Sequence, residues 1–153
     1  MQPISLWSLP FDNKVCETEI DGVALQGDEA DDTIVGTERS DLLRGGGGTD
    51  RLRGEDGANC LYGQFGLDRL RGGAGDDQIW GNPGRDRISA GAGNDVVRTG
   101  PGRDTVKGGP GHDGIVAQGG GADAVSCGPG FDRAIVDRKD AVSDGCERLF
   151  VAR

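Results

Sequence analysis

The chain has 153 residues, of which 30 are glycine, 34% are hydrophobic and 5% are aromatic. A conventional packed core is not expected from so small an apolar fraction. The formal net charge of −9 argues against a simple nucleic-acid binder and favours cations or basic partners, and no apolar run approaches the length of a membrane span.

Residues 1–26 precede any regular pattern and carry scattered apolar residues, among them Trp7, Phe11 and Ile20. The segment lacks the basic start and apolar stretch of a secretory signal. Because a stack of repeats needs a cover at each end, we interpret residues 1–26 as an N-terminal cap.

A nine-residue repeat begins at Gly27 and continues to residue 135 as twelve blocks, with one extra residue, Ala117, before the last two. The fourth position is glycine in ten blocks and the sixth is Asp in eleven, with Asn59 as the exception. The eighth position is always apolar. Such a fixed period is the signature of a repeat architecture and predicts a solenoid.

Each block divides into a glycine-rich turn and a polar-apolar-polar triplet, which is typical of a very short strand with one inward side chain. If two blocks complete one coil of 18 residues, alternate blocks build two parallel sheets. The predicted interior is then a thin column of eighth-position side chains. One sheet contributes Ile34, Leu52, Leu70, Ile88 and Val106, and the other contributes Leu43, Leu61, Ile79, Val97 and Ile115.

Blocks such as GGAGDDQIW and GGPGHDGIV resemble the RTX, or hemolysin-type, nonapeptide repeat Gly-Gly-x-Gly-x-Asp-x-U-x, in which U is a large apolar residue. The resemblance covers residues 27–135. It implies an all-β fold, a parallel β-roll (a β-solenoid) of twelve nonapeptide repeats with two repeats per coil, and Ca²⁺ ions held in the turns.

By match to the motif, the resemblance assigns calcium ligation to the sixth-position aspartates. They are Asp32, Asp41, Asp50, Asp68, Asp77, Asp86, Asp95, Asp104, Asp113, Asp123 and Asp132. The blocks of Asp32 and Asp41 lack the fourth-position glycine, and Asn59 retains an oxygen but no charge. Stacked carboxylates would repel one another without a cation, so we expect several Ca²⁺ ions to bind and metal binding and folding to be coupled.

Residues 136–153 follow the repeat and are predicted to form a C-terminal cap. Cys127 and Cys146 are expected to pair, and closing a loop of this size contributes about 3 kcal/mol. Cys16 with Cys60 is the default second bond, with two free thiols as the alternative. Four cysteines in a chain with a thin core favour an oxidising compartment, and together with the resemblance they predict a secreted, extracellular protein.

The outward seventh and ninth positions carry two further patterns. Alternate blocks stack the cations Arg51, Arg69 and Arg87 in one row and Arg53, Arg71 and Lys107 in the next. The other blocks place Tyr62 and Trp80 between Arg44 and Arg98, where cation–π contacts are possible. The basic stripe is interpreted either as a solvated strand face or as a binding surface for an anionic polymer such as a glycan, lipid or nucleic acid.

Catalysis is not expected. The single histidine, His112, occupies a turn position, and no Ser/His/Asp or Cys/His set is evident. The sequence therefore predicts a monomeric calcium-binding module with a structural or adhesive role, with anionic-polymer binding as the alternative.

Overall fold

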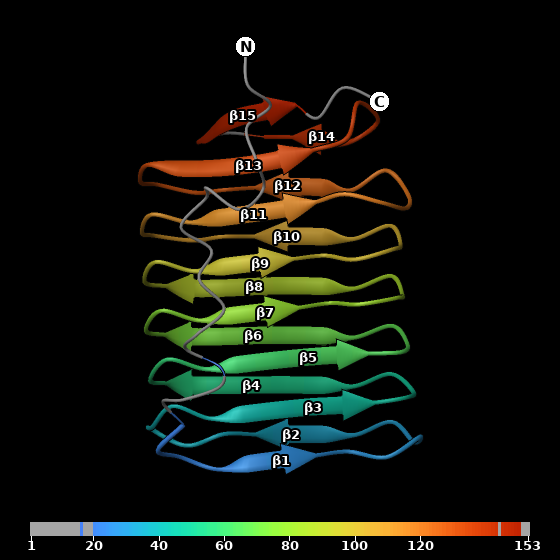
Figure 1. Ribbon diagram of the computed structural model, residues 1–153, viewed down its shortest axis with the longest axis vertical. Coiled ribbons are helices and arrows are strands. Elements are labelled where there is room, and N and C mark those ends of the chain that lie inside the picture. Colours follow the sequence, from blue (N-terminus) through green and yellow to red (C-terminus); the bar gives the residue numbers. More distant parts are fainter. Residues whose placement is uncertain (1–15, 17–19, 144, 151–153) are drawn as a thin grey trace.

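The computed structural model describes residue 16, residues 20–143 and residues 145–150, and these residues form fifteen β-strands (Figure 1). The strands are β1 (Ala24–Gln26), β2 (Thr33–Val35), β3 (Leu42–Gly46), β4 (Arg51–Asp56), β5 (Cys60–Gln64), β6 (Arg69–Ala74), β7 (Gln78–Trp80), β8 (Arg87–Ala92), β9 (Val96–Arg98), β10 (Thr105–Lys107), β11 (Gly114–Ala117), β12 (Ala124–Ser126), β13 (Asp132–Val136), β14 (Ala141–Val142) and β15 (Cys146–Phe150).

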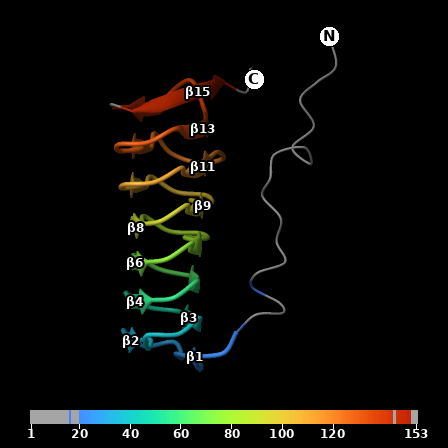
Figure 2. The ribbon, with the colours of Figure 1, turned by 90° about the vertical axis from the view of Figure 1, so that its left-hand side faces the viewer.

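Alternate strands build two parallel sheets, as the repeat predicts. The odd-numbered strands β1 to β15 follow one another in an eight-stranded sheet, and the even-numbered strands β2 to β14 form a seven-stranded sheet. Figure 2 shows the two sheets on opposite sides of a single column of coils. The predicted fold class, an all-β parallel β-roll, is therefore confirmed.

The register places each residue opposite the residue one coil later. Leu52 of β4 is aligned with Leu70 of β6, which is aligned with Ile88 of β8, so each step is 18 residues as predicted. The extra residue Ala117 lengthens β11 and is completely buried, and the step becomes 19 residues between β10 and β12. Strands β2 to β13 each begin in one of the twelve blocks, while the number of family repeats stays a prediction.

The eighth-position side chains form the core. Every residue of the two predicted columns is buried, from Ile34 with 8% exposure to Leu43, Leu61 and Ile79 with none. Val125 and Ala134 continue the columns beyond Ala117. The interior is one side chain deep from each sheet, which explains how a chain with few apolar residues fills it.

Several strands are longer than the three residues that the repeat suggests. Strand β4 continues through Gly54 to Asp56 because Glu55 and Asp56 pair with the next coil. The turn that follows β5 still requires glycine at the fourth position. Gly66 has a φ of +142°, and a Cβ there would lie 1.6 Å from the carbonyl oxygen of Gly48 one coil earlier.

Strands continue the roll into both predicted caps. Strand β1 lies within the region assigned to the N-terminal cap and pairs with β3 of the repeat. Strands β14 and β15 extend the two sheets after residue 136. The cap residues Trp7 and Phe11 lie outside the described residues. The domain boundaries 1–26, 27–135 and 136–153 therefore stay predictions.

Both predicted disulfides are present. Cys16 is bonded to Cys60 on β5, and Cys127 is bonded to Cys146 at the start of β15. The first bond holds a residue that precedes the roll against the outer face of the odd-numbered sheet. The second joins the last repeat block to the final strand.

The outer face of the odd-numbered sheet carries the predicted aromatic pair. The rings of Tyr62 and Trp80 are stacked with centroids 4.5 Å apart and an interplanar angle of 6°. The guanidinium carbon of Arg44 lies 5.6 Å from the Tyr62 ring centroid, and that of Arg98 lies 5.9 Å from the Trp80 centroid. Among the described residues no helix has the length and hydropathy of a membrane span.

Candidate metal centre

The sixth-position side chains form two columns, one at the start of the strands of each sheet. In both columns, a carboxylate oxygen accepts a hydrogen bond from the backbone N–H of the sixth position one coil earlier. The Asp50 N–H donates to Oδ1 of Asp68 at 2.9 Å, and the Asp68 N–H donates to Oδ1 of Asp86 at 2.9 Å. The Asp77 N–H donates to Oδ1 of Asp95 at 2.8 Å in the other column. We call this arrangement the Asp ladder.

The second carboxylate oxygen of most ladder residues has no donor. Within the described part of the chain, eight Oδ2 atoms are buried without a hydrogen-bond partner. They belong to Asp50, Asp68, Asp77, Asp86, Asp95, Asp104, Asp113 and Asp132. Native proteins leave few buried polar groups unsatisfied, so this regular series is a candidate site for a group that pairs with the oxygens.

A backbone carbonyl lies near Oδ2 in the blocks that begin with glycine, which are those of Asp50, Asp68, Asp77, Asp86 and Asp113. The point that a Cβ of Gly45 would occupy lies 2.3 Å from Oδ2 of Asp50 and 2.6 Å from the carbonyl oxygen of Gly63 one coil later. The equivalent point at Gly63 lies 2.6 Å from Oδ2 of Asp68 and 2.7 Å from the carbonyl oxygen of Gly81. Two acceptors face each other without a donor between them, which is an arrangement that a cation satisfies.

Asn59 shows what fills this place when the carboxylate is absent. Its Oδ1 keeps the ladder bond and accepts from the Asp41 N–H at 2.9 Å. Its Nδ2 lies where the other blocks have Oδ2, and donates to the carbonyl oxygens of Asp56 and Gly57 at 3.2 Å each. The amide N–H groups of Asn59 thus supply the hydrogen-bond donor that is missing beside Oδ2 of the aspartates. The sequence showed that Asn59 lacks the charge of an Asp, but it did not predict that Nδ2 would donate to the carbonyl oxygens of its own turn.

The ends of the ladder are closed by the protein itself. Oδ2 of Asp32 accepts from the Asp28 N–H at 2.9 Å, and Oδ2 of Asp41 accepts from the Thr37 N–H at 2.5 Å. These two blocks lack the fourth-position glycine, and there the carboxylates cap their own turns. Asp140, which the sequence analysis missed because it lies outside the nine-residue register, extends one column by accepting from the Asp123 N–H at 2.9 Å.

Burial shifts the protonation of the ladder. Desolvation raises the pKa of eight ladder carboxyls above their ordinary value of 3.8, a backbone N–H opposes the shift, and neighbouring carboxylates add to it. The pKa of Asp50, Asp68 and Asp123 is raised. The pKa is about 8 for Asp77 and Asp86, about 7 for Asp95, and about 6 for Asp104 and Asp113.

The donor set fits Ca²⁺. The described residues contain no group of three or more His, Cys, Asp or Glu side chains suited to a metal ion. The further oxygens near Oδ2 belong to backbone carbonyls such as that of Gly63. A carboxylate oxygen with carbonyl oxygens is the hard, flexible ligand set that Ca²⁺ prefers, whereas Zn²⁺ favours nitrogen and sulfur. The residues that would hold the ion are the eight with an unpartnered Oδ2. Which of the predicted ligands bind remains a prediction.

The predicted partner-binding residues lie on two separate faces. Arg51, Arg69 and Arg87 are exposed and adjacent on β4, β6 and β8, and Arg53 and Arg71 are aligned beside them. Lys107 is exposed on β10 and is aligned with Ser89. Tyr62 and Trp80 lie on the other sheet, so the sequence-predicted set does not form one surface.

Acidification should stabilise the fold when no metal is bound. The carboxyls of Asp77 and Asp86, with a pKa of about 8, and those of Asp95, Asp104 and Asp113, with a pKa of about 6 to 7, lie above the value of 3.8 in the unfolded chain, so the folded state binds more protons between about pH 4 and about pH 8. The free energy of unfolding in the presence of a chelator should fall as pH rises through this window. Urea denaturation at a series of pH values measures it, and a flat profile would contradict the pKa shifts.

Replacing Asn59→Asp should create another cation site. The change removes the Nδ2 donor and leaves the carbonyls of Asp56 and Gly57 facing a carboxylate oxygen. We expect the chelated protein to lose about 1–3 kcal/mol of stability and the calcium-loaded protein to bind more Ca²⁺ in calorimetric titration. Asn94→Asp, in an exposed turn, adds the same charge as a control. Equal behaviour of the two variants would show that only net charge matters.

Comparison with known proteins agrees with the repeat. A search of curated proteins gives no match. The family model described as RTX calcium-binding nonapeptide repeat (4 copies) matches residues 26–59, 62–97 and 90–121, which is more than half of the chain. With its parallel β-roll and its repeated aspartates, the chain belongs to the family of RTX calcium-binding nonapeptide repeat proteins.

Proposed function

We propose that this protein is a secreted module that folds on binding several Ca²⁺ ions and serves a structural or adhesive role without catalysis. The RTX repeat is a calcium-binding, structural type of repeat. The observation that carries the proposal is the series of eight buried Oδ2 atoms that lack a donor among the described residues. Each becomes satisfied when a cation lies between it and the nearby carbonyl oxygens.

Calcium would supply stability that the apolar core cannot. The core is a column of single side chains, and the chain has a formal charge of −9. At neutral pH a folded chain without metal must either ionise carboxylates in a buried position or keep them protonated. Both cost free energy relative to the unfolded chain, in which the carboxylates are ionised and solvated. A bound cation removes this conflict, so metal binding contributes directly to the free energy of folding.

The two disulfides support an oxidising location. Disulfide bonds persist in extracellular proteins and are rare in the reducing cytosol. Cys16–Cys60 and Cys127–Cys146 both connect residues of the roll to segments outside the twelve blocks. We therefore propose an extracellular monomer whose ends are fastened covalently and whose repeats are held by calcium.

Calcium should convert the chelated protein from a largely unfolded chain to the β-roll. Far-ultraviolet circular dichroism during a Ca²⁺ titration at pH 7.5 should show a cooperative rise in β-structure, and Mg²⁺ should not replace Ca²⁺ because it requires tighter octahedral geometry. A spectrum that is already fully β without metal and does not respond to Ca²⁺ would refute calcium-driven folding.

A second candidate function is binding of an anionic polymer, such as a glycan, lipid or nucleic acid, by the basic stripe. The specific observation is the parallel register of Arg51, Arg69 and Arg87, which repeats a positive charge at roughly 4.8 Å, the strand spacing. Among the described residues the ion pair present near this face joins Arg53 to Glu55, with 2.8 Å between nitrogen and oxygen. The first row thus keeps its charge available for a ligand.

The triple substitution Arg51→Ser, Arg69→Ser and Arg87→Ser should abolish salt-dependent binding to an anionic polymer. Heparin, anionic phospholipid vesicles and single-stranded RNA serve as separate probes in titrations at several salt concentrations. A variant with Arg39, Arg133 and Arg138 changed to Ser removes three exposed charges elsewhere and should bind nearly as well as the unaltered protein. Equal loss in both variants would assign the binding to net charge.

A further inference from the structure

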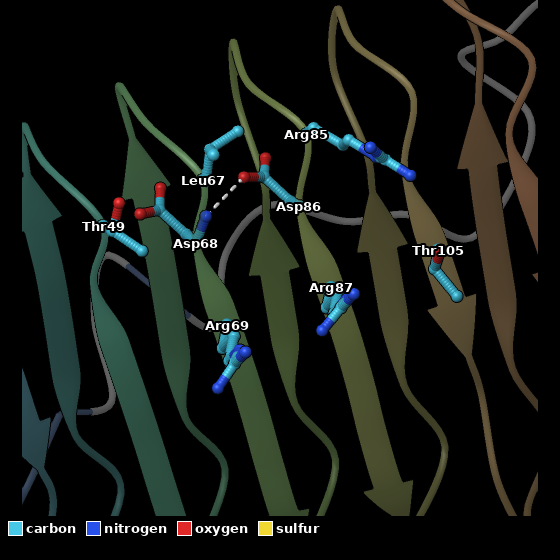
Figure 3. Close-up of a pocket in the computed structure, with 8 residues that line it drawn as sticks. All are labelled: Thr49, Leu67, Asp68, Arg69, Arg85, Asp86, Arg87 and Thr105. Atoms are coloured by element: carbon cyan, nitrogen blue, oxygen red, sulfur yellow. Dashed lines mark hydrogen bonds between the residues drawn. The ribbon is translucent and has the colours of Figure 1, made fainter.

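A pocket lies on the edge of the even-numbered sheet, between the turns and the first residues of β6, β8 and β10. Its cationic lining is formed by Arg69, Arg85 and Arg87. Figure 3 shows Arg69 and Arg87 projecting from equivalent points of neighbouring strands, with Arg85 extending from the turn before Asp86. We call this feature the Arg pocket. Arg85 was not predicted as a binding residue because it is a turn position outside the stripe.

The three guanidinium groups are available for a ligand. Arg69, Arg85 and Arg87 are exposed, and none forms an ion pair with an acidic residue in the described part of the chain. The hydroxyl-bearing residues Thr49 and Thr105 border the pocket on its two sides. Guanidinium groups bind tetrahedral oxyanions through paired, charge-assisted hydrogen bonds, and threonine hydroxyls can add neutral ones.

An apolar side chain also borders the pocket. Leu67 is 55% exposed and lies beside the cationic groups, and Phe65 in the same turn is 69% exposed. A free inorganic anion would make no use of these surfaces. An oxyanion that is esterified to a larger organic group would contact Leu67 with that group.

The acidic wall of the pocket connects it to the metal centre. Asp68 and Asp86 line the pocket, and both have a buried Oδ2 without a partner among the described residues. Their negative charge would oppose an anion, whereas a Ca²⁺ ion held by Oδ2 compensates it. Arg69 also belongs to a different coil from Arg85 and Arg87, so the three residues line one pocket only when the coils are stacked.

We propose that the Arg pocket is a binding site for a sulfate ester or phosphate monoester group, and that it is formed only in the calcium-loaded roll. The proposal deepens the second candidate function and rests on it for the open basic face. By linkage, ester binding stabilises the folded roll. The factor by which calcium raises the affinity for the ester equals the factor by which the ester raises the affinity for calcium. Calcium would thus control when the protein can bind its anionic partner.

Calorimetric titration of the calcium-loaded protein with phenyl sulfate and, separately, phenyl phosphate tests the site. One-site saturable binding is expected for at least one ester, and the difference between the two distinguishes the source of the oxyanion. Arg85→Ser and Arg87→Ser should each weaken binding on the order of tenfold, since a charge-assisted hydrogen bond is lost. Arg138→Ser, an exposed residue between β13 and β14 that lies outside both the stripe and the pocket, should change it less than about twofold.

Circular dichroism of the same samples confirms that each variant is folded. Absence of saturable binding, or equal weakening by Arg138→Ser, would overturn the proposal. If heparin binds through the stripe while neither phenyl ester binds, the second candidate function stands and the Arg pocket fails. If the esters bind equally well to a folded, chelated protein, the calcium requirement is wrong, and this result is separate from failure of the anion site itself.

Discussion

The structure depends on one hydrogen bond that is repeated along the roll. Each sixth-position carboxylate or amide accepts from the backbone N–H one coil earlier, as Asp68 does from Asp50 and Asn59 does through its bond to Asp41. This bond recurs in coils of 18 residues and in the 19-residue coils that contain Ala117, and it leaves Oδ2 of eight aspartates buried without a donor among the described residues. At Gly45 the same oxygen also excludes a side chain, because a Cβ there would lie 2.3 Å from Oδ2 of Asp50. Fold and metal centre are therefore consequences of one contact.

Charge is distributed across the roll by the same geometry. The carboxylates are buried between the coils, and the arginines of the even-numbered sheet point to solvent. The protein is acidic by composition, yet one outer face is basic. When a cation neutralises the buried carboxylates, the exposed arginines of the even-numbered sheet are the main charges that another molecule meets on that face. Composition alone favours cations or basic partners and does not indicate this face.

Sequence periodicity predicts the backbone well because every coil obeys the same rule. The stacked sheets, the core column from Ile34 to Ile115 and the Arg44–Tyr62–Trp80–Arg98 arrangement all follow from position within the repeat. The disulfides of Cys16 and Cys146, which lie outside the repeat, were predicted instead from the even number of cysteines. The periodicity does not predict that Oδ1 of an Asp accepts a hydrogen bond while Oδ2 lacks a donor, because this depends on which oxygen the backbone N–H contacts. Asp140 was missed since it extends the ladder from outside the period. The role of Arg85 required the packing of neighbouring turns.

Each coil of the roll contacts only the coils next to it, so its folding cooperativity arises from contacts between neighbouring coils. In such a structure, opening starts at the ends, where a coil has a neighbour on one side only. The Cys127–Cys146 bond joins the last block to the final strand, and the Cys16–Cys60 bond holds a preceding residue on the third strand of its sheet. Both crosslinks therefore lie toward the places where fraying would begin. The middle coils, which have no crosslink, contain the carboxyls with the highest pKa values, so resistance to opening depends there on what compensates the buried acids.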